Sequence, residues 1–165
     1  VQIAWIVTDE RGIILEKTVS KIVPEGFKIP KEASAIHGIY QYDADMHGSR
    51  LDTVLHSLNR VAFGAQCIVG HNIEYDLHII EAEMYRCKIE SMLNSPDKFC
   101  TMCESRDFCN LPSGKYPKLG ELYNILFGKK LNNAHDALSD VQATMECYWE
   151  MKRQGIHYIP DDLPF

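Results

Sequence analysis

Two aspartates, Asp76 and Asp140, occupy matching places in two segments whose apolar residues recur at helical spacing. Asp76 lies three residues after Ile73 and four before Ile80, at the edge of one apolar stripe, and Asp140 has the same relation to the other stripe. An ionised carboxylate at the margin of a core is costly unless a cation meets it, and neither segment places a Lys or Arg beside it on that face. A single aspartate of this kind is more often a solvated edge residue. Two in matching places favour a site for a divalent cation, which prefers oxygen ligands.

His135 stands five residues before Asp140. If the last helix begins with Asp136 as its N-cap, His135 lies on the preceding loop and can fold back over the two aspartates. A neutral imidazole in that place could accept a proton from water, as a general base does. The alternative is a surface histidine at a helix start, and the nearby aspartates favour the catalytic interpretation.

The elements that must position these residues begin with a predicted β-hairpin. Residues 1–9 and 12–23 read as strands, and the link Asp9-Glu10-Arg11-Gly12 is typical of a tight turn. A short helix over residues 31–36 is expected to end at Gly38. We found no repeat or linker, so strand–helix alternation after the hairpin predicts one α/β domain with a mixed sheet. Helices are predicted over residues 51–63, 73–87, 119–127 and 136–153, and strands over 67–70 and 99–102.

The composition is that of an ordinary globular domain. The 165 residues are 45% hydrophobic and 24% charged. No apolar run approaches the ~20 residues that span a bilayer, and the first apolar stretch, residues 1–7, lacks the features of a signal peptide. We therefore expect a cytoplasmic protein without a membrane partner. The net charge of −6 argues against a protein that binds a long nucleic-acid duplex through many phosphate contacts. It does not argue against a nuclease, because bound cations reverse the local field of a carboxylate site.

Six cysteines are present, several of them among apolar residues. Without a secretory signal, reduced thiols are the expected state. Cys100, Cys103 and Cys109 also suggest a zinc-bearing interaction domain, but no second cysteine pair or close pair of histidines completes four ligands. An oxidoreductase is disfavoured, because no G-x-G-x-x-G motif follows a strand.

Taken together, these motifs resemble those of the DEDDh 3′→5′ exonucleases, the DnaQ-like family of the RNase H-like superfamily. The segment from Gly70 to Asp76 (GHNIEYD) resembles the second family motif, and the segment from Ala134 to Asp140 (AHDALSD) resembles the third. Residues 35–39 (AIHGI) are similar to a segment that lies against the terminal nucleotide in the family. The resemblance implies an RNase H-like three-layer fold, with a mixed central sheet flanked by helices. It covers residues 1–154, which we take as the exonuclease domain, and leaves residues 155–165 as a tail.

The resemblance also implies a function. It implies a metal-dependent 3′→5′ exonuclease that acts on the single-stranded 3′ end of DNA or RNA and releases nucleoside 5′-monophosphates. Its role could be in DNA replication, as a proofreading enzyme, in DNA repair or in RNA processing, and the sequence does not choose among these. Asp76 and Asp140 would be metal ligands, with two Mg²⁺ or Mn²⁺ ions in the complete site, and His135 would be the general base. The sequence does not choose between DNA and RNA, because local geometry reads the 2′-hydroxyl. Four residues are implied in substrate binding: His37, Gly38, His71 and Asn72.

One family motif, the Asp-x-Glu of the opening strand, is absent. In relatives it precedes a strand that resembles residues 1–5, and Asp9-Glu10 cannot replace it because these residues lie in the hairpin turn. The missing strand belongs in the centre of the sheet, so its absence would leave unpaired backbone in the core. We expect the full-length protein to supply it and residues 1–165 alone to be inactive. The absence also supports an alternative, a non-catalytic RNase H-like module that binds nucleic acid or a polymerase.

The last five residues, Asp161-Asp162-Leu163-Pro164-Phe165, resemble the acidic tip of bacterial single-stranded-DNA-binding proteins. Such a tip could bind a replication or repair protein, because a terminal Phe with its carboxylate fits a pocket rimmed by a basic residue. The favoured alternative is an ordinary frayed terminus.

Overall fold

The computed structural model describes residues 2–131 and 136–156, apart from the side chain of His37. Two features predicted above, His135 and the end of the tail at residues 161–165, lie outside these residues. Within the described residues, an initial hairpin is followed by alternating strands and helices, as the sequence predicts.

The hairpin consists of β1 (Gln2–Thr8) and β2 (Ile14–Lys21), which pair in antiparallel fashion. Its turn is the predicted one. The Asp9 carboxylate accepts a hydrogen bond from the backbone N–H of Ile13 at 2.8 Å. Gly12 has a φ of 82°, a conformation that residues with a Cβ rarely adopt.

A parallel strand pair forms the second part of the sheet. β3 (Cys67–Gly70) leads into α4 (Ile73–Arg86), and the chain then returns as β4 (Asp97–Cys100) beside β3. Within the described residues the strands therefore form two separate two-stranded sheets, one antiparallel and one parallel. The mixed strand directions agree with the prediction, whereas the single continuous sheet that the sequence predicts is divided in two.

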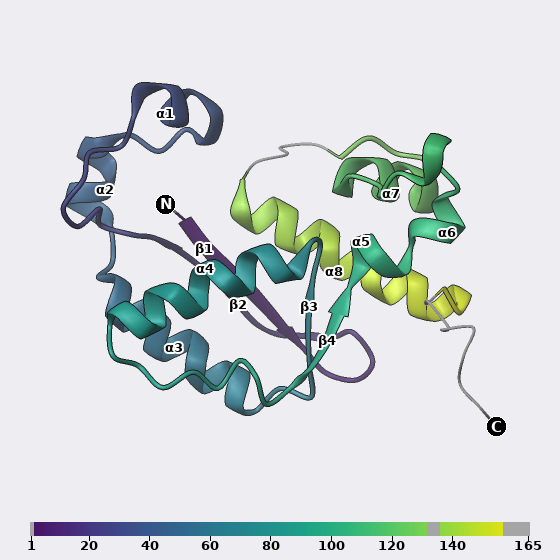
Figure 1. The fold of residues 1–165 in the computed structure, drawn as a ribbon, viewed down its shortest axis with the longest axis horizontal. Coiled ribbons are helices and arrows are strands. Elements are labelled where there is room, and N and C mark those ends of the chain that lie inside the picture. Colours follow the sequence, from purple (N-terminus) through teal and green to yellow (C-terminus); the bar gives the residue numbers. More distant parts are fainter. Residues whose placement is uncertain (1, 132–135, 157–165) are drawn as a thin grey trace.

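Helices surround these strands (Figure 1). Most were predicted from apolar periodicity and terminal glycines, but α2, α5 and α6 were not. No helix in the described part of the chain is both long and apolar enough to cross a bilayer. The remaining elements are α1 (Lys31–His37), α2 (Gln41–His47), α3 (Leu51–Phe63), α5 (Thr101–Glu104), α6 (Arg106–Cys109), a 3₁₀ turn (Pro112–Gly114), α7 (Leu119–Phe127) and α8 (Ala137–Gln154).

The two faces of β1 pack against different helices, which gives the molecule its layers (Figure 1). Alternate side chains of a strand point to opposite faces. Those of Ile3, Trp5 and Val7 join the apolar cluster formed with α3 and α4. On the other side, α8 packs along β1 and β3. A Cβ atom on Gly12 would lie 3.1 Å from the Trp149 ring of α8, so the hairpin turn also rests on this helix.

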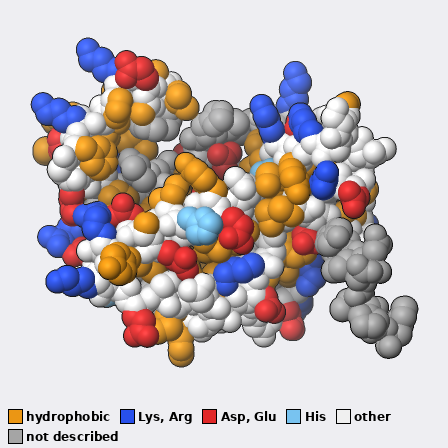
Figure 2. Space-filling view, viewed as in Figure 1, with side chains coloured by type: hydrophobic (Ala, Val, Ile, Leu, Met, Phe, Trp, Pro, Cys, Tyr) orange, Lys and Arg blue, Asp and Glu red, His pale blue; other side chains and the backbone are white. Residues whose placement is uncertain are grey.

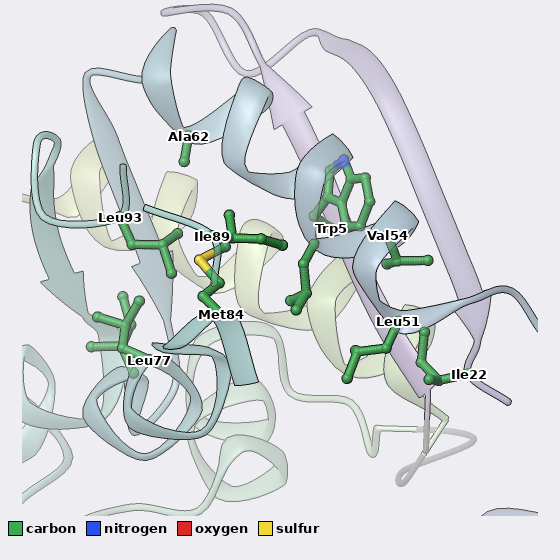
Figure 3. Packing of buried hydrophobic residues seen from close by; sticks show 11 residues of the cluster. Trp5, Ile22, Leu51, Val54, Ala62, Leu77, Met84, Ile89 and Leu93 are labelled. Atoms are coloured by element: carbon green, nitrogen blue, oxygen red, sulfur yellow. The ribbon is translucent and has the colours of Figure 1, made fainter. Parts of the chain in front are cut away.

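Two apolar cores hold the layers together. The larger joins β1 to α3 and α4 and continues into the loop after α4 (Figure 3). The smaller joins α7 to α8 through the fully buried Leu122, Cys147 and Met151. The buried members of the larger core are Trp5, Ile22, Leu51, Val54, Leu55, Ala62, Ile73, Leu77, Met84, Ile89 and Leu93.

A cavity of about 1420 Å³ separates the two sheets, and we call it the inter-sheet groove. Every residue of β1 and of β3 lines it, together with residues of α3, α4 and α8. Each of these strands pairs with its hairpin or parallel partner along one edge, and β1 and β3 do not pair with each other.

Candidate active site

The two aspartates singled out from the sequence line the same inter-sheet groove. Asp76 lies in the first turn of α4 and Asp140 in the first turn of α8. The groove thus receives a carboxylate from each of two helices that are far apart in the sequence. Both lie near helix N-termini, where the helix dipole favours negative charge.

A tight turn between β3 and α4 positions Asp76. A Cβ atom on Gly70 would lie 2.8 Å from the Cβ of Ile73, so a larger residue at position 70 would push the helix start away. Asn72 adopts a left-handed conformation with a φ of 66°, which asparagine tolerates better than most residues. These two residues let α4 begin directly after the strand, with Asp76 one turn further on.

The environment of Asp76 suits a cation. Solvent reaches the residue, yet burial of its carboxyl group against the groove walls raises its pKa. No described residue forms a hydrogen bond or ion pair with this carboxylate. A partly desolvated carboxylate without a donor gains most from a bound positive charge.

Replacing Asp76 with asparagine should raise the melting temperature of the metal-free protein at neutral pH. Burial raises the folded-state pKa, so the charged carboxylate destabilises the fold at any pH above the unfolded value of about 3.9. The gain should be largest at neutral pH, shrink as the pH falls through the folded-state pKa, and disappear only below the unfolded value, where the carboxyl group is protonated in both states. Thermal unfolding in EDTA from pH 4 to 8 measures it.

Glu74→Gln is the matched control, because Glu74 lies in the same helical turn with its side chain 72% exposed. It should leave the melting temperature unchanged. A lower melting temperature for Asp76→Asn at pH 7 would contradict the described environment.

The start of α8 follows the sequence prediction. Asp136 is the N-cap, and its carboxylate accepts hydrogen bonds from the backbone N–H and the hydroxyl of Ser139, each at 3.0 Å. This cap fixes Asp140 one turn into the helix, half-buried at the groove wall. His135, the predicted general base, precedes the cap and lies outside the described residues.

His71 lines the groove, but both of its ring nitrogens already have polar partners within the protein. Its Nε2 lies 3.0 Å from the carbonyl oxygen of Pro117, and its Nδ1 lies 3.0 Å from the hydroxyl of Thr101. Burial lowers the pKa of His71. A neutral ring must donate from Nε2 to the carbonyl, so Nδ1 accepts from Thr101. Both nitrogens are thus occupied, and a direct contact between His71 and substrate, which the resemblance implies, stays a prediction.

The other predicted substrate residues are distributed over two regions. Asn72 is exposed at the start of α4, beside the groove. Gly38 is exposed at the end of α1, where it forms the predicted left-handed cap with a φ of 68°, and it is not among the described residues that line the groove. The side chain of His37 lies outside the description. The substrate roles of these residues remain predictions.

The described residues do not form a complete metal site. Within residues 2–131 and 136–156, no group of three or more His, Cys, Asp or Glu side chains is placed to hold one ion. The zinc site considered for Cys100, Cys103 and Cys109 is therefore not formed, and Cys109 packs instead against the core between α7 and α8. The chemistry of Asp76 and Asp140 fits Mg²⁺ or Mn²⁺, with further ligands required.

Basic side chains flank this face of the molecule despite its negative net charge. Figure 2 shows blue Lys and Arg side chains over the α1–α2 region and over the α6–α7 side. The exposed basic residues are Lys28 and Lys31 in the α1–α2 region, and Arg106, Lys115, Lys118, Lys129 and Lys130 on the α6–α7 side. Acidic residues outnumber the basic ones in the α1–α2 region, whereas the basic ones are in the majority on the α6–α7 side, which could therefore attract a phosphate backbone.

Comparison with known proteins gives a consistent result. The family model for exonucleases of the RNase T type matches residues 1–148. No curated protein sequence matches the chain significantly. Several solved structures do match it in three dimensions.

E. coli Exonuclease I in complex with a dA16 oligonucleotide is 21% identical, with a TM-score of 0.76 over 92% of this chain. A zinc-bound form of the E. coli Exonuclease I–ssDNA complex is 22% identical, with a TM-score of 0.75 over 93%. Exonuclease I from Methylocaldum szegediense is 23% identical, with a TM-score of 0.75 over 93%. The match covers 36% of each of those chains. These similarities confirm the predicted RNase H-like α/β fold.

Proposed function

This chain belongs to the RNase T exonuclease family, and we propose that it forms the catalytic domain of a metal-dependent 3′→5′ exonuclease. Its substrate would be the single-stranded 3′ end of DNA or RNA, and its products nucleoside 5′-monophosphates. The observation that carries this proposal is the presence of Asp76 and Asp140 on the walls of one groove.

Each residue has a defined task in this proposal. Asp76 and Asp140 would hold Mg²⁺ or Mn²⁺, which when bound supplies Lewis-acid stabilisation to the negative charge on the phosphate oxygens. His135 would take the proton of the attacking water. His71, fixed by Thr101 and Pro117, keeps the turn before α4 in place and thereby orients Asp76.

A single strand is the substrate that the surface supports best. Basic residues on the α6–α7 side could guide phosphates towards the groove (Figure 2). The net charge of −6 does not favour a long duplex interface. Two of the structurally similar Exonuclease I structures hold a dA16 oligonucleotide and ssDNA.

A non-catalytic RNase H-like module is the second candidate. It is favoured by the fact that the described residues provide two carboxylates and no group of three metal-binding side chains. Such a module would bind a nucleic acid or a polymerase without cleaving it.

Digestion of 5′-labelled single-stranded oligonucleotides by the full-length protein tests the proposal. With Mg²⁺ we expect a ladder of progressively shorter labelled products and free mononucleotides, and no reaction in EDTA or with a blocked 3′ end. DNA and RNA versions of one sequence determine which is preferred. Binding without cleavage would establish the non-catalytic module, and products from a blocked 3′ end would exclude the 3′→5′ direction.

A further inference from the structure

A pair of cysteines stands directly beside the turn that starts α4. Cys100 is the last residue of β4, and Cys103 lies in α5, so that Cys100-Thr101-Met102-Cys103 follows the β3–α4–β4 unit without a gap. Cys100 is half-buried and Cys103 is exposed. A Cys-x-x-Cys segment adjoining a βαβ unit is typical of dithiols that undergo redox chemistry.

The surroundings of Cys100 favour its thiolate. Burial alone would raise the pKa of Cys100, but the backbone N–H groups of Cys103, Ile73 and Asn72 and the thiol of Cys103 outweigh it and lower the pKa. Burial and the interaction with Cys100 raise the pKa of Cys103 to about 11. Cys100 is therefore the better nucleophile and Cys103 the resolving thiol.

Three other cysteines, Cys67, Cys109 and Cys147, lie in a different environment. Burial raises the pKa of Cys67 and Cys109, and it raises that of the fully buried Cys147 to about 12. These side chains pack in or beside the apolar layers. A buried thiol with a raised pKa reacts slowly with oxidants.

Thr101, the residue after Cys100, ties the pair to the candidate active site. It is fully buried, and its hydroxyl lies 3.0 Å from His71 Nδ1 and 3.2 Å from the carbonyl oxygen of Gly70. Its own carbonyl accepts a hydrogen bond from the hydroxyl of Ser105 at 2.6 Å. This anchoring resists movement of the segment. The side chains of Cys100 and Cys103 interact with each other, so the two sulfurs lie close together. Because Cys103 is exposed, a disulfide formed here would be accessible to reductants.

We propose that Cys100 and Cys103 are a redox-active dithiol that hydrogen peroxide converts into a reversible disulfide. The Cys100 thiolate attacks one peroxide oxygen, the O–O bond breaks, and Cys100 becomes a sulfenic acid while hydroxide leaves and is protonated to water. The sulfur of Cys103 then attacks the sulfur of Cys100, and the hydroxyl group leaves as a second water. Two sulfurs lose two electrons in total, and one peroxide becomes two waters. The proposal is independent of nuclease activity.

The sequence offers a direct readout. Trypsin cuts after Lys98 and Arg106, so one peptide, residues 99–106, holds Cys100 and Cys103 without another cysteine. The reduced full-length protein is treated with hydrogen peroxide, alkylated and digested. We expect this peptide to lose two hydrogens and to escape alkylation before the other cysteines are oxidised, because Cys100 has the higher thiolate content. Dithiothreitol should restore alkylation. Oxidation of Met102 adds an oxygen and is distinguished by mass.

Variants assign the two roles. In Cys103→Ser the sulfenic acid has no resolving thiol, so dimedone should label Cys100, whereas wild type and the matched control Cys109→Ser should show no label there. If Cys103→Ser folds poorly by circular dichroism, the wild-type peptide masses still decide the question. The proposal is overturned if residues 99–106 stay alkylatable while other cysteines oxidise, or if dimedone labels Cys103 in Cys100→Ser as fast as Cys100 in Cys103→Ser.

Discussion

Replacing either Asp76 or Asp140 with asparagine should lower nucleotide release by the full-length protein on the order of 10³-fold or more. Each change removes a negative oxygen ligand from the groove and preserves the shape of the side chain. Charge stabilisation by a bound metal is worth several kcal/mol, and each 1.4 kcal/mol corresponds to a factor of ten in rate. Initial rates on a 5′-labelled single strand over a range of Mg²⁺ concentrations measure the loss.

Glu74→Gln controls for the removal of a negative charge from the same turn of α4, because Glu74 is exposed and does not line the groove. It should keep the wild-type rate. Asp76→Asn should be inactive yet at least as stable as wild type, which separates a loss of chemistry from a loss of fold. Rates within a few-fold of wild type for both aspartate variants would remove the basis of the proposed function.

His135→Ala should lower the rate about 10²–10⁴-fold, the usual contribution of a general base. The change leaves both aspartates in place, so the Mg²⁺ concentration for half-maximal activity should stay close to that of wild type. The rate of wild type should fall as the imidazole becomes protonated at low pH, and this fall should be absent from the pH–rate profile of the variant. Single-turnover rates from pH 5 to 9 test both expectations.

His78→Ala is the matched control for that variant, since His78 is an exposed histidine on α4 that does not line the groove. Its rate should equal that of wild type. A His135→Ala protein with the wild-type rate and pH profile would show that another group accepts the proton.

Local sequence patterns predicted the elements with strong periodicity and clear ends. The helix over residues 51–63, the strand over residues 67–70 and the helix over residues 119–127 have the predicted bounds, because apolar stripes and terminal glycines are local signals. α2, α5 and α6 carry seven, four and four residues and have no side-chain cap hydrogen bond. Helices this short depend on tertiary contacts, which no local pattern reveals.

The same distinction applies to the candidate site. Helical spacing was sufficient to place Asp76 and Asp140 on the faces that line one groove. It could not reveal that His71 is held by Thr101 and Pro117, which are 30 and 46 residues away along the chain. No sequence pattern around Thr101 indicated that this residue would be buried against His71. Contacts of this range become visible only when the fold is known.

The inter-sheet groove has a consequence for the behaviour of residues 1–165 in solution. β1 and β3 line it from opposite sides, and each has a hydrogen-bonded neighbour along one edge within the described structure. A strand with a free edge is a template for any extended peptide, including another molecule of the same chain. We therefore expect this chain by itself to self-associate through these strand edges as its concentration rises. An extra strand that pairs with both β1 and β3 would occupy these two edges, and it would thereby suppress the association.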